Sequence, residues 1–148
     1  MVKHITGKPS TKSESWSRLI RYIGHWQALN FGYWVVENKS DEIFLGEVGF
    51  ANHMRDLNPP KTDVPEIGWV LASHAHGRGI ATEAVAAALV WGDAKLRSDR
   101  TFCMFDPDHT ASQNVAKKNG YYEIGIADYL GNSALIMERR IVVATANC

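Results

Sequence analysis

Apolar side chains recur at helical spacing in three parts of this chain, and these parts are predicted to be helices. The first and third begin with a capping-box pattern, in which a threonine is followed three residues later by a side chain that can reach back. The pairs are Thr11 with Glu14 and Thr110 with Gln113, and Gly120 provides a common helix stop. The pattern thus predicts helices over residues 12–23, 80–96 and 110–120.

Between these helices, short runs rich in β-branched and aromatic residues are bounded by polar turns. Two runs flank the turn 39–42 and predict a hairpin, and the last two are expected to pair as antiparallel strands. Only residues 58–63 resemble a loop of any size. The order of elements indicates an α/β (α+β) fold. The predicted strands cover residues 32–38, 43–52, 66–72, 101–105, 121–126 and 134–143.

Composition narrows the class of protein without naming a function. A chain of 148 residues without repeats or linkers is expected to form a single domain over 1–148. Sixteen basic residues balance sixteen acidic ones, so we expect no nucleic-acid or membrane partner. The sequence contains no apolar run long enough for a membrane span and no signal peptide. Two cysteines do not make a disulfide framework, and a cytoplasmic location is the default expectation.

The most informative segment joins the predicted strand 66–72 to the long helix. It contains Gly77 and Gly79 immediately before the helix begins at Ile80. A strand, a glycine turn and a helix N-terminus form an anion site, because the first-turn amides and the helix dipole both favour negative charge. Ile80 and Ala81 replace the Lys-Ser/Thr of a P-loop, and the mid-chain position argues against a dinucleotide fold. An ordinary loop before a helix would have a similar sequence.

Two further blocks identify a family. The run Glu-Ile-Gly-Trp-Val-Leu precedes the turn, and Ser112 to Tyr121 matches the pattern Asn-x-x-Ser…Lys-x-Gly-Phe with His109 in place of the asparagine. Together with the turn, they resemble the GNAT superfamily of acetyl-CoA-dependent N-acetyltransferases, in particular the branch of ribosomal-protein N-terminal acetyltransferases. The resemblance spans roughly residues 13–140 and implies a central mixed, mostly antiparallel sheet flanked by helices.

This resemblance implies that acetyl-CoA is the co-substrate and that a primary amine, on a peptide N-terminus or a small molecule, is the acceptor. The coenzyme motif of the branch, Gln/Arg-x-x-Gly-x-Gly/Ala, falls on His76, Gly79 and Ala81, so His76 departs from the usual side chain. Backbone of the preceding strand is expected to pair with the pantetheine arm. The expected coenzyme-binding residues are Val70, Leu71, His76, Gly77, Arg78, Gly79, Ile80, Ala81, Thr82, His109 and Ser112.

Amide formation requires a neutral amine, and one carboxylate acting through water can suffice for an N-terminal amine. Glu66, at the start of the strand before the turn, is the first candidate base, with a structural ion pair as the equal alternative. Glu47 is the second candidate. Ser112 is a candidate to hydrogen-bond the sulfur or the pantetheine arm, although it could equally be a plain helix N-terminal serine. His74 and His76 lack further ligands at suitable spacing, so no metal site is expected.

The chain departs from the family in two respects. An alanine, Ala116, occupies the position where many members carry a tyrosine acid. The usual first strand and helix are missing, so the domain is expected to be N-terminally shortened and the strand 32–38 to have a bare edge. A second copy, giving a homodimer, or the segment 141–146 would cover this edge. Besides an active N-acetyltransferase, a non-catalytic acyl-CoA-binding module therefore stays open.

Overall fold

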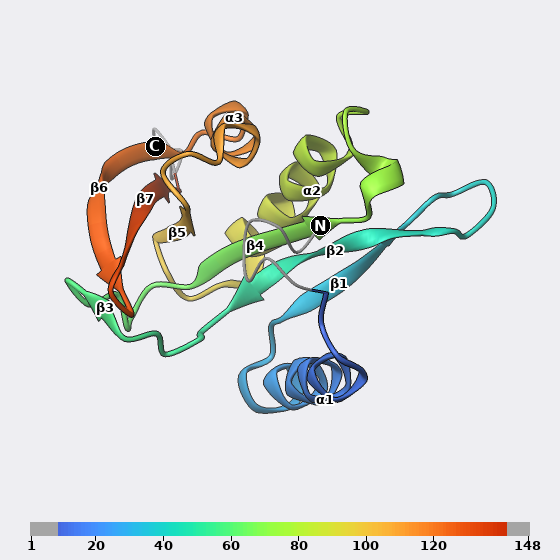
Figure 1. The fold of residues 1–148 in the computed structure, drawn as a ribbon, viewed down its shortest axis with the longest axis horizontal. Coiled ribbons are helices and arrows are strands. Elements are labelled where there is room, and N and C mark those ends of the chain that lie inside the picture. The colour runs from blue at the N-terminus through green and yellow to red at the C-terminus, as the bar shows by residue number, and fades with distance from the viewer. Residues whose placement is uncertain (1–8, 142–148) are drawn as a thin grey trace, which may run out of the picture.

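The computed structural model describes residues 9–141, which form one seven-stranded sheet with helices on both faces (Figure 1). The helices are α1 (Lys12–Leu29), α2 (Ile80–Lys95) and α3 (Thr110–Lys118), and a 3-10 turn, η1, spans Ser73–Ala75. The strands are β1 (Tyr33–Glu37), β2 (Phe44–Ala51), β3 (Leu57–Asn58), β4 (Glu66–Leu71), β5 (Arg100–Phe105), β6 (Tyr122–Tyr129) and β7 (Asn132–Arg140).

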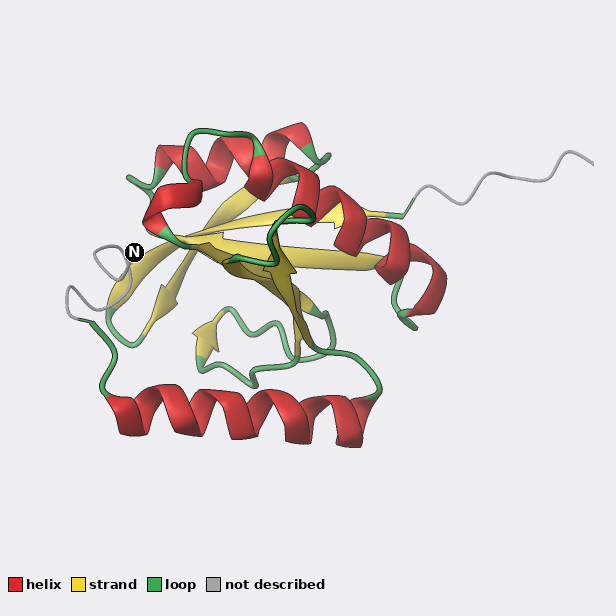
Figure 2. Cartoon of the chain, turned by 90° about the vertical axis from the view of Figure 1, so that its right-hand side faces the viewer, coloured by secondary structure: helices red, strands yellow, loops and turns green. Residues whose placement is uncertain are grey.

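The strand order in the sheet is β1-β2-β4-β5-β7-β6-β3. The β4–β5 pair is parallel, and the other described pairs are antiparallel. Helix α1 lies across one face of the sheet, and α2 and α3 cover the other (Figure 2). This is the mixed, mostly antiparallel architecture expected from the sequence.

Helix α1 is longer than predicted, because it continues through Gly24 to Leu29. The penalty for glycine in a helix is about 1 kcal/mol, and tertiary contacts offset it. The imidazole of His25 lies between the carbonyl oxygen of Phe31, 2.6 Å from Nδ1, and the amide of Asn52, which donates to Nε2 over 3.0 Å. Since Nε2 accepts, Nδ1 must be the donor, and this one side chain joins α1 to two loops.

The capping box at the start of α1 is confirmed, whereas the one expected at α3 is wrong. Thr11 and Glu14 exchange both bonds, at 2.7 and 3.1 Å. Helix α3 has His109 as its N-cap residue, and Gln113 instead donates to the carbonyl oxygen of Pro107 over 2.7 Å. With the Asp-Pro-Asp turn before α3, the N-cap position falls on His109 instead of Thr110, which a local pattern does not reveal.

Strand β3 was not predicted, because it is only two residues long and adjoins the proline-rich loop. It pairs with β6 and so forms the far edge of the sheet, and the segment 52–65 runs from β2 to this edge and back to β4 (Figure 1). The predicted last strand is confirmed as far as Arg140, and its expected end at residues 142–143 lies outside the described residues.

The main core lies between the sheet and α2. Its largest fully buried side chains are those of Phe50, Ile67, Met137, Val85 and Cys103. Gly92 lets α2 approach the sheet closely, because a Cβ there would lie 2.7 Å from the Phe50 ring. The buried face of α2 is formed by small and branched residues, Ala84, Val85, Ala88, Leu89 and Gly92.

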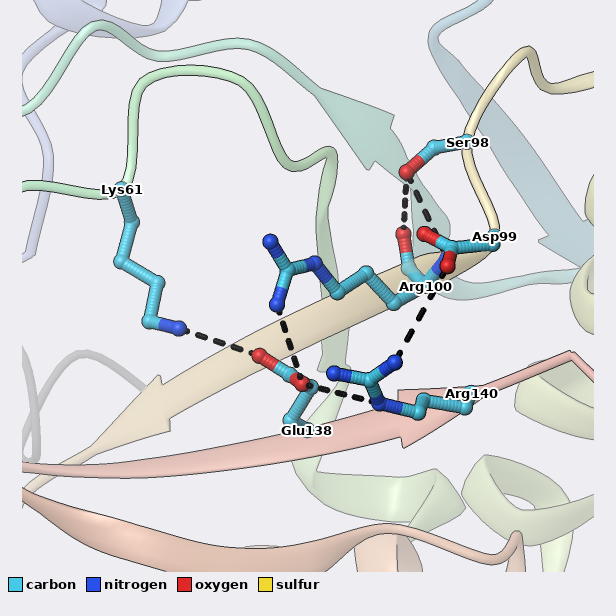
Figure 3. A network of polar contacts seen from close by, with 6 residues as sticks. All are labelled: Lys61, Ser98, Asp99, Arg100, Glu138 and Arg140. Atoms are coloured by element: carbon cyan, nitrogen blue, oxygen red, sulfur yellow. Dashed lines mark hydrogen bonds and ion pairs between the residues drawn. The ribbon is translucent and has the colours of Figure 1, made fainter.

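A second core under the segment 52–65 contains a buried carboxylate. Glu138 of β7 is 4% exposed, and three cations surround it (Figure 3). Lys61 Nζ lies 3.0 Å from Oε2, while Arg100 Nη1 and Arg140 Nε lie 3.6 and 3.8 Å from Oε1. The network thus ties the loop before β4 to the start of β5 and the end of β7.

The outer edge of β1 has no strand partner among the described residues, as expected for the strand 32–38. Phe50 donates its amide to Gly32, so even-numbered backbone groups of β1 face β2 and odd-numbered groups face outward. The outward carbonyl of Tyr33 accepts a bond from the Trp26 indole over 2.9 Å. Helix α1 therefore caps one end of this edge, whereas most of the expected cover, residues 142–146, lies outside the described residues.

Candidate functional site

The turn between β4 and α2 has the geometry of an anion site. Gly77 and Gly79 adopt left-handed φ angles of 72° and 73°, and Gly79 is the N-cap residue of α2. Within residues 9–141, no side chain caps this helix, and no atom lies within 4 Å of a Cβ placed on either glycine. The first turn of α2, from Ile80 to Thr82, therefore lacks a side-chain cap beside two open glycines, and a phosphate there would find donors and a favourable dipole.

His76 has a structural role in this turn. Its Nε2 lies 3.1 Å from the carbonyl oxygen of Leu71, and the ring nitrogen must donate because a carbonyl can only accept. This bond joins the end of β4 to the residue before the first turn glycine. It gives a physical reason for histidine where the family usually has Arg or Gln, because the side chain is used to shape the loop.

Strand β4 is paired with β5 only at its first residue. It stays paired with β2 as far as Leu71, but its register with β5 consists of one position, Glu66 with Phe102. Beyond that point, the rings of Trp69 and Phe105 meet at 5.4 Å between centroids. The two parallel strands diverge toward the turn that contains Gly77 and Gly79, leaving part of the β4 edge without a described strand partner.

Backbone alternation shows which β4 residues face this opening. Ala72 donates its amide to Leu45 of β2 over 2.8 Å, so the even-numbered backbone groups of β4 point toward β2. Val70 belongs to that set, whereas Leu71 and Trp69 point away from β2. Of the two strand positions predicted from the sequence, Leu71 is thus placed to meet a ligand, and Trp69 is an additional position that strand alternation could have revealed.

Helix α3 brings a second helix start to the same region. Ser112 lies half-buried in its first turn, after the N-cap residue His109. Asn119, at the other end, donates to the carbonyl oxygens of Val115 over 2.9 Å and Thr82 over 3.4 Å. That side chain links α3 to the first turn of α2 and so fixes the two helices that border the opening.

Glu66 is held in an ion pair, which is the alternative that the sequence left open. Arg55 Nε and Nη2 donate to its two carboxylate oxygens over 2.7 and 3.1 Å, and Arg55 Nη1 donates to Tyr129 over 3.2 Å. Burial raises the pKa of Glu66, and Arg55 opposes that shift. Both oxygens accept from Arg55, which favours the charged carboxylate, so Glu66 takes up a proton less readily than it would without Arg55.

Glu47 occupies a more accessible position on the same face of the sheet. Its Cα is the register partner of Val70, and its side chain is 19% exposed. Arg18 of α1 lies 3.8 Å from Oε1. Burial and then a hydrogen bond to Glu47 raise the pKa of Tyr22, so this hydroxyl stays protonated beside the carboxylate.

Other polar groups on this face were not predicted. His53 lies near Tyr33, with 6.4 Å between ring centroids. Burial, followed by the charge of Arg55, lowers the pKa of His53 to about 4, so the imidazole is neutral at pH 7. Arg55 follows Glu47 by eight residues and precedes Glu66 by eleven, and no local motif relates the three.

Other reactive or aromatic side chains lie mostly in the core. Cys103 is fully buried, and burial raises the pKa of its thiol. Phe31 and Trp34 pack against the main core. Within residues 9–141, no three side chains gather as metal ligands, and no helix is long and apolar enough to cross a bilayer.

Comparison with known proteins agrees with this geometry. Residues 1–122 match a family model described as an acetyltransferase (GNAT) domain. The curated relative YkkB of Bacillus subtilis (strain 168), an uncharacterized protein, is 32% identical over 89 residues, or 60% of this chain. The match covers 49% of YkkB, so the chain spans about half the length of this relative.

Solved structures show the same fold. A protein of Bordetella pertussis described as a GnaT-family acetyltransferase has a TM-score of 0.82 and 27% identity, covering 91% of this chain and 81% of that one. RimL, a ribosomal L7/L12 alpha-N-protein acetyltransferase in complex with coenzyme A, has a TM-score of 0.72 and 18% identity, covering 89% and 74%. The family model matches most of this chain, residues 1–122, and the chain therefore belongs to the GNAT acetyltransferase family.

Proposed function

We propose that this chain transfers an acetyl group from acetyl-CoA to a primary amine by direct attack. One observation carries the proposal: an uncapped helix N-terminus, preceded by two left-handed glycines, opens beside the part of β4 that β5 leaves unpaired. The first feature suits a pyrophosphate and the second suits an extended amide chain. Coenzyme A contains both.

The coenzyme would lie along β4 with its phosphates at α2. Amides from Gly77 to Thr82 would hold the pyrophosphate, and Arg78 lies within that turn. The Leu71 amide and the Trp69 backbone groups would pair with the pantetheine arm, because the Val70 groups point toward β2 and the Leu71 carbonyl is bonded to His76. Ser112, in the first turn of α3, would hydrogen-bond the sulfur or the arm.

We assign the base to Glu47 in preference to Glu66. The amine must lose a proton as it attacks the thioester carbonyl, and the resulting thiolate of coenzyme A takes up a proton as it leaves. Glu47 can accept the first proton, directly or through one water, because its contacts are one long ion pair with Arg18 and a hydrogen bond with Tyr22 rather than a bidentate arginine pair. Glu66 would have to give up two bonds to Arg55.

The acceptor class is a peptide N-terminus or a small-molecule amine. An α-amine has a pKa near 8 and a lysine amine one near 10.4, so a single carboxylate helps the former enough at neutral pH. The likeness to RimL favours a protein N-terminus as the first class to assay.

A non-catalytic acyl-CoA-binding module is the second candidate. Ala116, at the position where many members have a tyrosine acid, is fully buried in the main core. The site therefore has no tyrosine at that position to protonate the thiolate, and solvent or a neighbouring hydroxyl would have to do so.

Thiol release separates the two candidates. The protein is mixed with acetyl-CoA and a panel of N-terminal peptides, polyamines and lysine peptides, and free thiol is measured with Gly79→Val as the control. Amine-dependent release by the native chain alone supports the enzyme. Tight acetyl-CoA binding by calorimetry without release for any amine would favour the binding module, and no binding at all would refute both.

A further inference from the structure

Helix α1 carries large apolar side chains that no other part of residues 9–141 buries. The exposed fraction is 63% for Trp16, 49% for Leu19, 48% for Ile20 and 59% for Ile23, and no residue of α1 is buried. Spacing of three and four residues places them on one side of the helix, whereas Arg18, Tyr22 and His25 contact the body from the other side. This apolar row consists of Trp16, Leu19, Ile20 and Ile23.

The size of the apolar row indicates an interface. Four large side chains, each about half exposed, present roughly 500 Å² of apolar surface, which is close to the largest patch that a monomeric protein usually exposes, and such patches are often functional. Two such surfaces together would bury about 1,000 Å², which is the lower limit for a specific protein interface.

The row is complementary to itself about a two-fold axis. If two α1 helices pack antiparallel with the axis between Leu19 and Ile20, each Trp16 lies over Ile23 of the other copy. Gly24, next to Ile23, has no described atom within 4 Å of a Cβ placed on it. Gly24 of one copy leaves room for the indole of Trp16 of the other copy, so the largest side chain of the row lies beside a residue without a side chain.

Charge does not oppose this pairing. The residues that flank the row on the Gly24 side are Ser13, Ser17 and Gln27, and Lys12 is the charged residue in line with it. Antiparallel packing places Lys12 opposite Gln27 rather than opposite another cation. The chain has a formal net charge of zero, so two copies do not repel each other at long range.

We propose that a second copy of this chain covers the apolar row, through antiparallel packing of the two α1 helices. The dimer would leave the coenzyme turn open, because α1 and α2 lie on opposite faces of the sheet (Figure 2). This interface differs from pairing at the outer edge of β1, which is a separate surface.

Analytical ultracentrifugation of the full chain across a micromolar concentration series tests the proposal. The native chain should dimerise, and Ile20→Glu should raise the dissociation constant about a hundredfold or more, because two carboxylates meet beside the axis. Gly24→Gln should also weaken the dimer by filling the space for Trp16, although it favours the helix itself. Val90→Glu, at a 75% exposed position on α2, is the matched control and should remain dimeric.

Acetyl-CoA binding by each variant, measured by calorimetry, should equal that of the native chain and confirms folding. A native chain that stays monomeric throughout the series overturns the proposal. So does a dimer that withstands both Ile20→Glu and Gly24→Gln, or one that is broken instead by Val35→Lys at the outer edge of β1.

Discussion

Replacing Gly79 with alanine tests the coenzyme turn, because stability and binding should respond separately. The residue has a φ of 73°, a conformation that costs a residue with a side chain about 1 kcal/mol. No atom of the described chain lies within 4 Å of the new Cβ, so no internal clash adds to this cost. We therefore expect Gly79→Ala to fold, with the free energy of unfolding lowered by about 1 kcal/mol.

Binding should fall by much more. The methyl group would enter the space in which a phosphate must approach the first-turn amides of α2. Loss of one or two charge-assisted hydrogen bonds, each about 1.5–3 kcal/mol, should raise the dissociation constant for acetyl-CoA at least tenfold, and a hundredfold is within reach. Gly79→Val, with a bulkier side chain, should abolish measurable binding.

The chain provides a matched control in the turn between β6 and β7. Gly131 has a φ of 82° and likewise no described atom within 4 Å of a Cβ placed on it. Gly131→Ala should lose the same stability in urea unfolding while binding acetyl-CoA as the native chain does in calorimetry. If Gly79→Ala binds as tightly as Gly131→Ala, with both folded, the phosphate does not lie at this turn.

Three further outcomes are expected. Glu47→Gln should lower kcat about a hundredfold at neutral pH and leave acetyl-CoA affinity unchanged, and its kcat should recover at high pH, where the amine is already neutral. If Glu47→Gln has a normal rate and a folded Glu66→Gln is inactive, the two roles are reversed. The pKa of His53 is about 6.5 in an unfolded chain and about 4 in the fold, so the unfolded chain binds more protons between these values. The contribution of neutral His53 to stability is complete above about pH 6.5 and is lost as the pH falls toward 4. On acidification, the free energy of unfolding of His53→Gln should therefore fall by about 1–2 kcal/mol less than that of the native chain, allowing for solvent screening. An equal fall for both proteins in urea unfolding would contradict this. Glu138→Gln should lower the free energy of unfolding by about 2–4 kcal/mol, because it leaves Lys61 with an uncompensated, largely buried charge. Asp99→Asn, which breaks an exposed ion pair, should lower it by less than about 1 kcal/mol. Equal losses in denaturant unfolding would show that burial of the ion pair is unimportant.

The elements could be predicted from the sequence where the signal is local. The glycine turn and the helix at Ile80 follow from the order of residues, as does the capping box at Thr11. The extension of α1 through Gly24 could not be predicted, because it depends on His25 contacting Asn52, 27 residues away. Contacts between residues far apart in the sequence outweigh the low helix propensity of one glycine, and a local sequence pattern does not show such contacts.

The candidate site divides in the same way. Gly77 and Gly79 are two positions apart in the sequence, so the sequence alone places them in one turn. The status of Glu66 depends on Arg55 and Tyr129, and Arg55 and Tyr129 are 74 positions apart. A carboxylate on a strand has the same local sequence whether it is bound by an arginine or available to a substrate, so sequence alone could not choose between Glu66 and Glu47.

Amide chemical shifts during a titration with coenzyme A offer the most direct test of where the coenzyme lies. We predict the largest changes for residues 77–82 and for Trp69 and Leu71, with little change at Val70, whose amide points toward β2. Gly131, in the turn between β6 and β7, should not respond. Binding with no shifts at residues 77–82, or no binding at all, would contradict the proposed site.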